Sequence, residues 1–410
     1  MANIETDPLL RPHQPLTGKT VLLGVSGGIA AYKAADLASN LVQLGADVHV
    51  LMTKTATTFI APGTFAALTQ NEVHDNVLER WHRGFTGHIT LAHSADAFIV
   101  APATANTIAN LALGLASEII GTTALSTQAP LLIAPAMEHA MFHHPATQEH
   151  LATLVARGAT IIGPEPGRLA SGEWGDGRLS PVADLTGAVR NAVGRSGALA
   201  GKRIVVTAGG THETLDPVRF LGNGSSGRMG YAIAQAAMDL GADVTLISGP
   251  TALPMPYGVQ AVPVVSAQEM YDAVHAALPT AGGIVMTAAV ADFRPATSST
   301  TKIKKTAGTD TMSLELAKNP DIIGSLKDEA LVKIGFAAET NDHIANGQTK
   351  LEAKGLDMVV VNDAVAAIGA RTNQATIITR GHEPEALPLM TKEHLAAEIA
   401  SRLAGMLATQ

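Results

Sequence analysis

Apolar residues recur along this chain in two similar series, each with a short apolar run, a glycine-rich turn, an amphipathic stretch and a second apolar run. In the first series, residues 20–24 lead into Ser26-Gly-Gly28, and a helical pattern closes at Leu44-Gly-Ala-Asp-Val48. In the second, residues 204–206 lead into a longer glycine-rich loop, and the helical pattern closes at Leu240-Gly-Ala-Asp-Val244. A buried strand followed by a helix and a returning strand is the unit from which parallel sheets are built.

The repeat predicts an α/β fold with two doubly wound, Rossmann-like three-layer domains, residues 1–193 and 201–410. Gly, Ser and Ala cluster between residues 195 and 200, where we expect the domains to join. Further apolar runs at residues 95–102 and 131–137 are typical of buried strands. Open α/β sheets hold ligands at the carboxyl ends of their strands, so the turns after these runs are candidate sites.

The loop from Thr207 to Gly230 is the strongest chemical signal in the chain. Its glycines let backbone N–H groups approach an anion, and the helix expected from about residue 227 adds the positive end of its dipole. The loop also carries Arg219, Asn223 and Arg228. An ordinary long connection is the alternative, but this loop has more anion-binding groups than a connection needs.

The first glycine turn indicates a different ligand from the one that most Rossmann domains take. Ser26-Gly-Gly28 lacks the Gly-x-Gly-x-x-Gly spacing of dinucleotide-binding turns, which disfavours NAD. The phosphate of a mononucleotide fits this turn better.

Composition limits the class of protein further. With 410 residues, 46% apolar, and a mean hydropathy of +0.20, the chain is expected to bury two full cores. Few aromatic residues and a net charge of −8 argue against nucleic acid as a partner. No apolar run reaches the length of a membrane span, and a cytoplasmic protein is expected. The absence of cysteine excludes thiolate chemistry, and His139, His143 and His144 form no recognisable metal-ligand pattern.

After about Thr17, the chain resembles the bifunctional bacterial proteins of coenzyme A biosynthesis, which join phosphopantothenoylcysteine decarboxylase to phosphopantothenate–cysteine ligase. The order of the motifs carries the resemblance. In the N-terminal half they are Ser26-Gly-Gly-Ile-Ala-Ala-Tyr-Lys33, Gly87-His-Ile89, Ala101-Pro-Ala-Thr-Ala-Asn-Thr107 and Pro135-Ala-Met137. In the C-terminal half they are the loop of residues 207–230, Ala288-Ala-Val-Ala-Asp-Phe-Arg294, Lys302-Ile-Lys-Lys305, Lys318-Asn-Pro-Asp-Ile322 and Gly335-Phe-Ala-Ala-Glu-Thr340.

For the N-terminal half, the resemblance implies a flavodoxin-like flavoprotein that uses FMN. Decarboxylation of a cysteine-derived carboxylate leaves a carbanion without a sink, and in the family FMN first oxidises the thiol to a thioaldehyde that accepts this charge. His88 is the implied acid/base or carboxylate-orienting residue, although an isolated histidine is more often a capping or core residue. The residues implied to hold FMN are Gly27, Gly28, Thr53, Thr104, Ala105, Asn106 and Thr107.

Two positions of this half depart from the family pattern. Glu138 stands where many members have an asparagine that binds the substrate carboxylate, and an ionised Glu138 would repel that group unless it were protonated or turned away. Ser171 stands where many members have a cysteine proton donor, and a hydroxyl is a much weaker acid than a thiol. The final proton then comes from Ser171 through water or from another group, unless this half is inactive.

For the C-terminal half, the resemblance implies that CTP converts the carboxylate of 4′-phosphopantothenate to an acyl-cytidylate, which the amine of cysteine attacks. Lys302 is the implied nucleotide-contacting cation, and Asn223 the implied stabiliser of the acyl-cytidylate. A solvated charge run is the alternative for residues 302–305. Mg²⁺ is implied by the triphosphate, with no acidic cluster to identify its ligands. The nucleotide contacts implied are Met286, Thr287, Ala288, Asp292, Lys302, Pro320, Asp321, Ile322, Ile323, Phe336, Lys350 and Lys354.

Three functions of different classes stay open at this point. The bifunctional enzyme is favoured over a ligase whose flavin-binding half serves only assembly, and a nicotinamide-dependent reductase is the third. The expected partners are small molecules, namely CTP, cysteine, 4′-phosphopantothenate and 4′-phosphopantothenoylcysteine. The resemblance also implies a homo-oligomer, with a trimeric flavin domain and a dimeric ligase domain in an assembly as large as a dodecamer.

Overall fold

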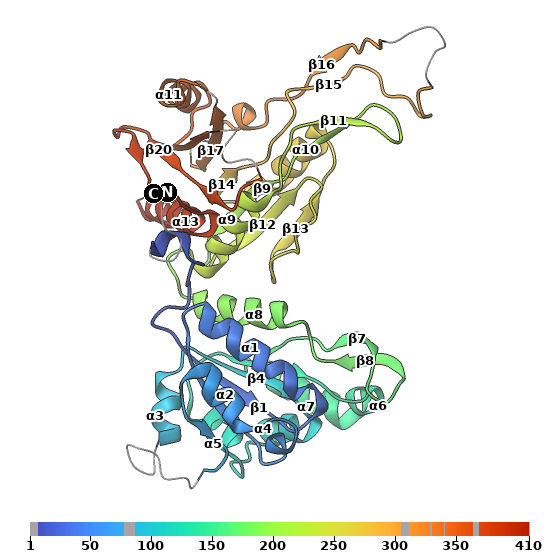
Figure 1. Ribbon diagram of the computed structural model, residues 1–410, viewed down its shortest axis with the longest axis vertical. Coiled ribbons are helices and arrows are strands. Elements are labelled where there is room, and N and C mark those ends of the chain that lie inside the picture. The colour runs from blue at the N-terminus through green and yellow to red at the C-terminus, as the bar shows by residue number, and fades with distance from the viewer. Residues whose placement is uncertain are drawn as a thin grey trace. The chain divides into compact units, whose positions relative to one another are not determined.

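The computed structural model describes residues 7–77, 87–304, 311–328, 330–339, 341–363 and 369–409 (Figure 1). Two residues of the predicted motifs, Lys305 and Thr340, lie outside these ranges. The chain divides into two compact units. One comprises residues 14–193, and the other combines the N-terminal residues up to His13 with those from Gly194 onward.

The first unit is built on a six-stranded, all-parallel sheet in the order β3-β2-β1-β4-β5-β6. Its elements, in chain order, are β1 (Thr20–Val25), α1 (Tyr32–Gln43), β2 (Asp47–Met52), α2 (Pro62–Thr69), β3 (Val73–His74), α3 (Gly87–Ser94), β4 (Ala97–Ala103), α4 (Ala105–Leu113), α5 (Ile119–Ser126), β5 (Leu131–Pro135), α6 (His139–His143), α7 (Pro145–Ala156), β6 (Thr160–Ile161), β7 (Glu165–Arg168), β8 (Trp174–Arg178) and α8 (Val182–Gly194). Strands β7 and β8 form a separate antiparallel hairpin.

The strand order confirms the Rossmann-like expectation for this unit. It is the 3-2-1-4-5-6 order of the dinucleotide-binding fold, and it differs from the 2-1-3-4-5 order of flavodoxin. The central strands are apolar along their length because helices cover both faces of the sheet, and β4 is buried at every position. Helix α1 turns Leu37 and Leu41 inward. The order reverses between β1 and β4, which is where open α/β sheets bind ligands.

The second unit contains an eight-stranded sheet in the order β13-β12-β9-β14-β17-β18-β20-β21. The first six strands are parallel in the same 3-2-1-4-5-6 order, and β20 and β21 are antiparallel additions. Its elements are η1 (Pro8–Leu10), β9 (Arg203–Ala208), β10 (His212–Thr214), β11 (Phe220–Gly222), α9 (Arg228–Asp239), β12 (Asp243–Ser248), β13 (Gln260–Pro263), α10 (Ala267–Ala277), β14 (Gly283–Met286), β15 (Phe293–Pro295), β16 (Leu316–Lys318), η5 (Ile323–Ser325), β17 (Val332–Glu339), α11 (His343–Ala353), β18 (Met358–Asp363), β19 (Thr372–Asn373), β20 (Ala375–Thr379), β21 (Glu385–Ala386), β22 (Met390–Thr391) and α13 (Lys392–Ala408).

Alternation along β9 builds the two cores of this unit. Ile204 and Val206 join the cluster under α9 and α13, whereas Val205 joins the cluster on the opposite face of the sheet. Helix α9 approaches β9 so closely that a Cβ at Gly230 would lie 2.5 Å from the Cβ of Ala208. Two doubly wound domains are thereby confirmed. Among the described residues, no helix combines the length and apolar character needed to cross a membrane.

The N-terminal segment lies in a different unit from the one expected, since the predicted first domain comprised residues 1–193. Residues 7–13 belong to the second unit, where η1 contacts β22, Leu9 packs on the core cluster, and the rings of His13 and His394 stand 4.9 Å apart. Sequence pattern misses this because the segment carries no periodicity of its own. Its position is decided by contacts with residues far along the chain.

Candidate functional site

In the first unit, the carboxyl ends of β1 and β4 are joined by one buried hydroxyl. Ser26, directly after β1, donates a hydrogen bond from Oγ to the carbonyl of Pro102 (2.7 Å) and accepts one from the N–H of Thr104 (2.9 Å). The Ser26 side chain therefore holds the first glycine turn against the start of α4, at the point where the strand order reverses. The sequence motif begins with this serine, but the pattern alone does not reveal its bridging role.

Six of the seven residues predicted for FMN line these two strand ends. Gly27 and Gly28 follow β1, Thr104 caps α4 by accepting from the N–H of Thr107, and Ala105, Asn106 and Thr107 form the first turn of α4. The seventh, Thr53, follows the neighbouring strand β2, where its buried Oγ1 accepts from the N–H of Ala56 at 3.1 Å. A helix N-terminus beside a glycine turn attracts an anion such as a phosphate.

The two glycines of the turn have different surroundings. A Cβ at Gly27 would lie 2.4 Å from the side chain of Thr55, so the protein itself leaves no room there. A Cβ at Gly28 would meet only Cγ2 of Thr104, at 3.6 Å, an ordinary contact. Space beside Gly28 is therefore open to a ligand, which fits the phosphate end of a mononucleotide.

The other two predicted residues of this half lie on different elements. His88 is the second residue of α3, half-buried, and α3 packs against α5. Ser171 is exposed at the tip of the β7–β8 hairpin, where the N–H of Gly172 bonds to the carbonyl of Leu169.

Glu138 is the N-cap of α6 and is turned into that helix. Its carboxylate accepts from the N–H groups of Ala140 (2.8 Å) and Met141 (3.2 Å). The hydrogen bond from Ala140 is the main cause that lowers the pKa of Glu138, although partial desolvation opposes it. The residue is therefore ionised, and its capping role holds the carboxylate in the helix turn.

In the second unit, the long glycine loop is joined to the segment that follows β14. The N–H of Ala289 bonds to the carbonyl of Gly209 (2.8 Å), and the N–H of Ala291 bonds to Oγ1 of Thr211 (3.0 Å). Asn223 donates from Nδ2 to the carbonyl of Val290 at 3.0 Å. The loop and the segment leading to Asp292 thus form one surface at the carboxyl ends of β9 and β14, the point where this sheet also reverses its order.

A buried carboxylate connects the same loop to the lysine segment. Asp216 has its side chain fully buried and accepts from the N–H groups of Val218, Arg219 and Ile303 and from the guanidinium of Arg219. Arg219 also donates to the carbonyl of Ile303 at 3.0 Å. Both backbone groups of Ile303 are therefore held, and Ile303 directly follows the exposed Lys302. The bonds from Arg219 lower the pKa of Asp216 below its usual range.

Asn319 performs a similar connection for the Lys318-Asn-Pro-Asp motif. It is buried and donates from Nδ2 to the carbonyl of Ala291 (2.8 Å), while its own N–H bonds to the carbonyl of Asp292 (2.8 Å). Arg294 donates to Oδ1 of Asn319 at 3.0 Å. Sequence reasoning assigned roles to neither Asp216 nor Asn319. Their only signal was a short polar residue next to proline inside a motif, which is equally typical of a turn.

The two predicted lysines near the end of α11 are each paired with another residue of the predicted nucleotide set. Lys350 donates from Nζ to the carbonyl of Phe336 at 2.6 Å, and Lys354 forms an ion pair with Asp321. Burial lowers the pKa of Lys350, and Lys354 adds to this, while Glu339, Asp292 and Asp321 oppose it. Four charged residues of the predicted nucleotide site, namely Asp292, Asp321, Lys350 and Lys354, are therefore close enough to interact electrostatically.

The remaining predicted nucleotide residues lie on the adjoining turns. Thr287 donates from Oγ1 to the carbonyl of Thr207 at 2.5 Å, and the N–H of Ala288 bonds to Oγ1 of Thr207 at 3.2 Å. Met286 ends β14, Pro320 follows Asn319, and the buried Ile322 and Ile323 cap and begin η5. The structure thus brings the predicted set to the carboxyl ends of β9, β14 and β17.

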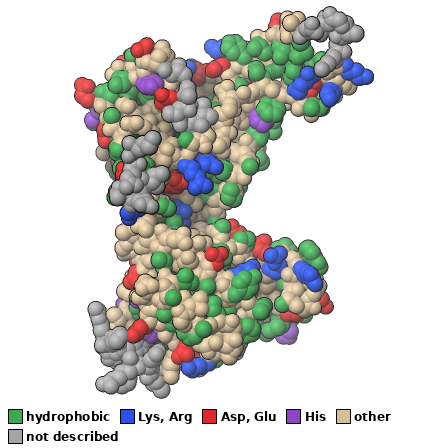
Figure 2. Space-filling view, in the orientation of Figure 1, with side chains coloured by type: hydrophobic (Ala, Val, Ile, Leu, Met, Phe, Trp, Pro, Cys, Tyr) green, Lys and Arg blue, Asp and Glu red, His purple; other side chains and the backbone are tan. Residues whose placement is uncertain are grey.

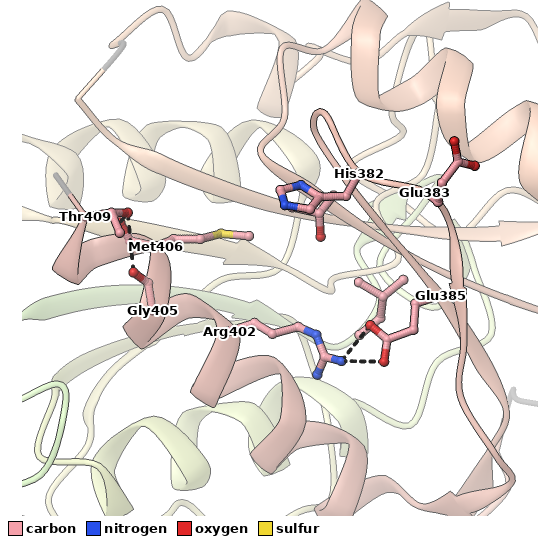
Figure 3. A pocket seen from close by; sticks show the side chains of 9 residues that line it. His382, Glu383, Glu385, Arg402, Gly405, Met406 and Thr409 are labelled. Carbon is pink, nitrogen blue, oxygen red and sulfur yellow. Dashed lines mark hydrogen bonds and ion pairs between the residues drawn. The ribbon is translucent and has the colours of Figure 1, made fainter.

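A hollow of about 540 Å³ lies elsewhere in this unit, between β20, β21 and α13 (Figure 3). Thr379 at its edge pairs with Met358, the first residue of β18, so the hollow is at the amino ends of the parallel strands. Arg402 in its wall is already paired with Glu385 at 2.9 Å and with Glu398. Position and neutralised charge both argue against a nucleotide site there.

The family models match two consecutive parts of the chain, which meet close to the boundary of the two units near residue 194. The flavoprotein model matches residues 9–194, and the model of the DNA/pantothenate metabolism flavoprotein C-terminal domain matches residues 199–407. Among solved structures, the C-terminal domain of a coenzyme A biosynthesis bifunctional protein CoaBC is 41% identical, with 52% of this chain and 100% of that chain covered and a TM-score of 0.46. A PPC decarboxylase complexed with pantothenoylaminoethenethiol is 30% identical, with 42% and 96% covered and a TM-score of 0.39.

Full-length relatives cover nearly all of the chain. The coenzyme A biosynthesis bifunctional protein CoaBC of Vibrio vulnificus is 45% identical over 395 residues, which are 95% of this chain and 98% of the relative. The protein of the same name from Bacillus subtilis is 44% identical over 400 residues, again 95% of this chain and 98% of the relative. These matches confirm the resemblance drawn from the motifs, including the pairing of a decarboxylase with a ligase. The chain therefore belongs to the family of bifunctional coenzyme A biosynthesis proteins.

Proposed function

We propose that this chain joins cysteine to 4′-phosphopantothenate at the expense of CTP and then decarboxylates the product to 4′-phosphopantetheine. The ligase reaction belongs to the second unit and the decarboxylation to the first. The observation that carries the proposal is the clamp on Ile303, by which we mean the hydrogen bonds of Asp216 and Arg219 to its backbone. The clamp ties the segment that contains Lys302 to the loop that contains Asn223. A cation and an amide held together at a strand edge suit the attack of a carboxylate on a nucleoside triphosphate.

In the ligase reaction, the carboxylate of phosphopantothenate attacks the α-phosphorus of CTP, and pyrophosphate leaves with the bonding electrons. Negative charge grows on the phosphates during this step, and Lys302 stabilises it. The amine of cysteine then attacks the acyl carbon, cytidine monophosphate leaves, and the amine loses a proton. Asn223 holds the acyl-cytidylate for this second attack. Mg²⁺ accompanies the triphosphate, as is usual for such substrates.

The partly buried lysine of α11 supports nucleotide binding in a second way. Burial and a neighbouring cation disfavour the charge of Lys350, so an incoming anion relieves an existing penalty. The ion pair of Lys354 with Asp321 fixes the adjacent turn. We infer that Phe336, whose carbonyl holds Lys350, borders the base.

In the first unit, Gly27, Gly28, Thr53 and residues 104–107 would hold FMN. The open space beside Gly28 and the capped N-terminus of α4 fit its phosphate. When bound, FMN supplies a hydride acceptor and donor that makes loss of CO₂ from the substrate feasible. His88 orients the substrate carboxylate or moves a proton, and Ser171 delivers the final proton directly or through water.

The alternative is a ligase whose first unit binds flavin without catalysis. Two observations favour keeping it. Glu138 is ionised as a helix cap, so a negative charge stands where many members of the family have a neutral amide for the substrate carboxylate. Ser171 is an exposed hydroxyl at the position where a stronger acid is expected. Measurement of CO₂ separates the two functions.

Exposed apolar side chains support a homo-oligomer. The ribbons β10–β11 and β15–β16 project from the second unit with Phe220 at 55% and Phe293 at 49% exposure, and Figure 2 shows apolar side chains gathered on this arm. Two-stranded ribbons are rarely stable without a packing partner, which another copy supplies. In the first unit, Ile29 and Tyr32 beside the glycine turn are 64% and 62% exposed. A neighbouring subunit over this turn would also cover FMN.

The test supplies purified protein with phosphopantothenate, cysteine and CTP and measures pyrophosphate, amide and CO₂ separately. We expect Lys302→Gln to slow pyrophosphate release by about 10²–10³-fold, by analogy with the loss of one transition-state donor. Lys304→Gln is the matched control, since Lys304 is an exposed lysine of the same segment. We expect Asn223→Asp to release pyrophosphate but form little amide. Near-normal pyrophosphate release by Lys302→Gln, or normal amide formation by Asn223→Asp, would refute the corresponding role.

The first unit is tested by the same assay. We expect His88→Asn to retain FMN and lose CO₂ release, and Ser171→Ala to slow a late step so that an oxidised intermediate accumulates. A wild-type protein that makes amide, binds FMN and releases no CO₂ would establish the alternative. Preparations of residues 1–193 that stay colourless after incubation with FMN would contradict flavin binding by this half.

A further inference from the structure

The β7–β8 hairpin, which carries Ser171, is fastened to α6 through one strand. The carbonyl of Gly177 accepts from the N–H of Met137 (3.1 Å), and the N–H of Asp176 donates to Nδ1 of His139 (3.0 Å). The carboxylate of Asp176 lies 2.9 Å from Nε2 of His143. His139 and His143 are four residues apart, so they face the hairpin from one side of α6.

Glycines on both sides of Asp176 allow this approach. A Cβ at Gly175 would lie 2.5 Å from Nδ1 of His139, and one at Gly177 would lie 2.1 Å from the carbonyl oxygen of Met137. Strand β8 therefore rests directly on the turn before α6. An isolated two-stranded hairpin is marginally stable in water, so these contacts decide its position.

The turn that holds the hairpin is also hydrogen-bonded to the predicted flavin site. The N–H of Ala136, next to Met137, bonds to the carbonyl of Ala103 at 3.0 Å, and Ala103 precedes the cap of α4. Arg178 at the end of β8 is close enough to Lys33 to lower the pKa of that lysine, after burial as the main cause. The base of the hairpin is thus tied to the elements that follow β1, β4 and β5.

The same three side chains also resemble a metal site, since their ligand atoms lie within 4.8 Å of one another. Metal-binding imidazoles use one nitrogen for the ion and donate from the other. Here Nδ1 of His139 accepts from a backbone N–H, which places the ring proton on Nε2, and His143 is turned to the carboxylate of Asp176. Direct hydrogen bonds account for this arrangement without an ion.

We propose that His139, His143 and Asp176 form a latch that holds the β7–β8 hairpin against α6 and so positions Ser171 for decarboxylation. The three are positioning residues and take no part in the chemistry. The inference rests on the proposed decarboxylase function for its kinetic consequence, but the latch itself is a property of the fold.

The test compares His139→Ala/His143→Ala and Asp176→Ala with Glu173→Gln, which alters an exposed carboxylate of the same hairpin. Limited digestion with trypsin reports hairpin opening, because Arg168 lies beside the tip of the hairpin and Arg178 at its base. We expect cleavage at these arginines to rise about tenfold in the latch variants, since cleavage follows the population of the open form. We expect kcat/KM for CO₂ release to fall while FMN content and pyrophosphate release, from the other unit, stay unchanged.

Cleavage and CO₂ kinetics equal to those of Glu173→Gln would overturn the latch. Wild-type protein whose hairpin becomes susceptible to trypsin on treatment with EDTA, and is protected again by Zn²⁺, would overturn it in favour of a metal-held hairpin. If the wild type released no CO₂ at all, the decarboxylase function would fail, and the trypsin comparison would still decide whether the latch exists.

Discussion

Replacement of Gly27 by alanine tests whether the protein itself, rather than a ligand, demands glycine in the first turn. The added Cβ would lie 2.4 Å from Cβ and Cγ2 of Thr55 and 2.8 Å from its carbonyl carbon. Carbon atoms pack best at about 3.5–4.0 Å, so Thr55 must move by more than 1 Å. Because a backbone atom is among the contacts, rotation of the Thr55 side chain cannot relieve the clash.

The magnitude follows from the cost of overpacking a well-packed region, about 1–3 kcal/mol. For a unit of this size that lowers Tm by roughly 2–4 °C per kcal/mol. Gly28→Ala is the matched control. Its backbone is extended, with φ −158°, and its new Cβ meets only Cγ2 of Thr104 at 3.6 Å. Loss of glycine's freedom in the unfolded chain makes this variant neutral or more stable by about 0.4–1 kcal/mol.

The assay is thermal unfolding of both variants without added flavin, followed by FMN titration. We expect Gly27→Ala to unfold at lower temperature and to bind FMN weakly, because displacement of Thr55 also disturbs the adjacent Thr53 turn. Pyrophosphate release by the second unit serves as the internal control. Equal Tm values for the two alanine variants would refute the steric reasoning.

Four further predictions concern the second unit and α6. Asp216→Asn should slow pyrophosphate release about 10²-fold, because the weaker hold on Ile303 displaces the adjacent Lys302, and CO₂ release should stay unchanged. Pyrophosphate release at the wild-type rate would refute the role of the clamp. Since Arg219 lowers the pKa of Asp216, the stability it contributes is present above its ordinary pKa near 3.8 and is lost as pH falls below it, so wild type and Asp216→Asn should converge in acid unfolding and differ at pH 6. Asn319→Ala leaves the buried carbonyl of Ala291 unpaired and should cost about 1–3 kcal/mol of unfolding free energy in denaturant titration. Glu138→Gln, which supplies a neutral amide while keeping a capping oxygen, should lower KM for the decarboxylase substrate. An unchanged or higher KM would show that the ionised carboxylate does not repel the substrate.

The architecture, and the sheet edges at which chemistry is expected, can be predicted from the pattern of apolar residues and glycines. Apolar runs such as residues 20–24 and 204–206 are buried on both faces of a parallel sheet, and that burial is a local property of composition. The glycine turns follow those strands in the chain, so their location at the carboxyl ends was fixed as soon as the strands were recognised. The family motifs added roles for His88, Asn223 and Lys302, which stay predictions.

Which side chains contact one another cannot be predicted in this way, because the contacts join segments that are distant in the sequence. Asp216 and Ile303 are 87 residues apart, and Ser26 and Thr104 are 78 apart, so no local pattern pairs them. His139 and His143 form no recognisable motif because their partner, Asp176, lies in a distant hairpin. That hairpin approaches α6 closely only because glycines flank Asp176. The segment of residues 7–13 joins the second unit for the same reason. Periodicity reports how each segment is buried, whereas contacts between distant segments depend on the free energy of the whole packed unit.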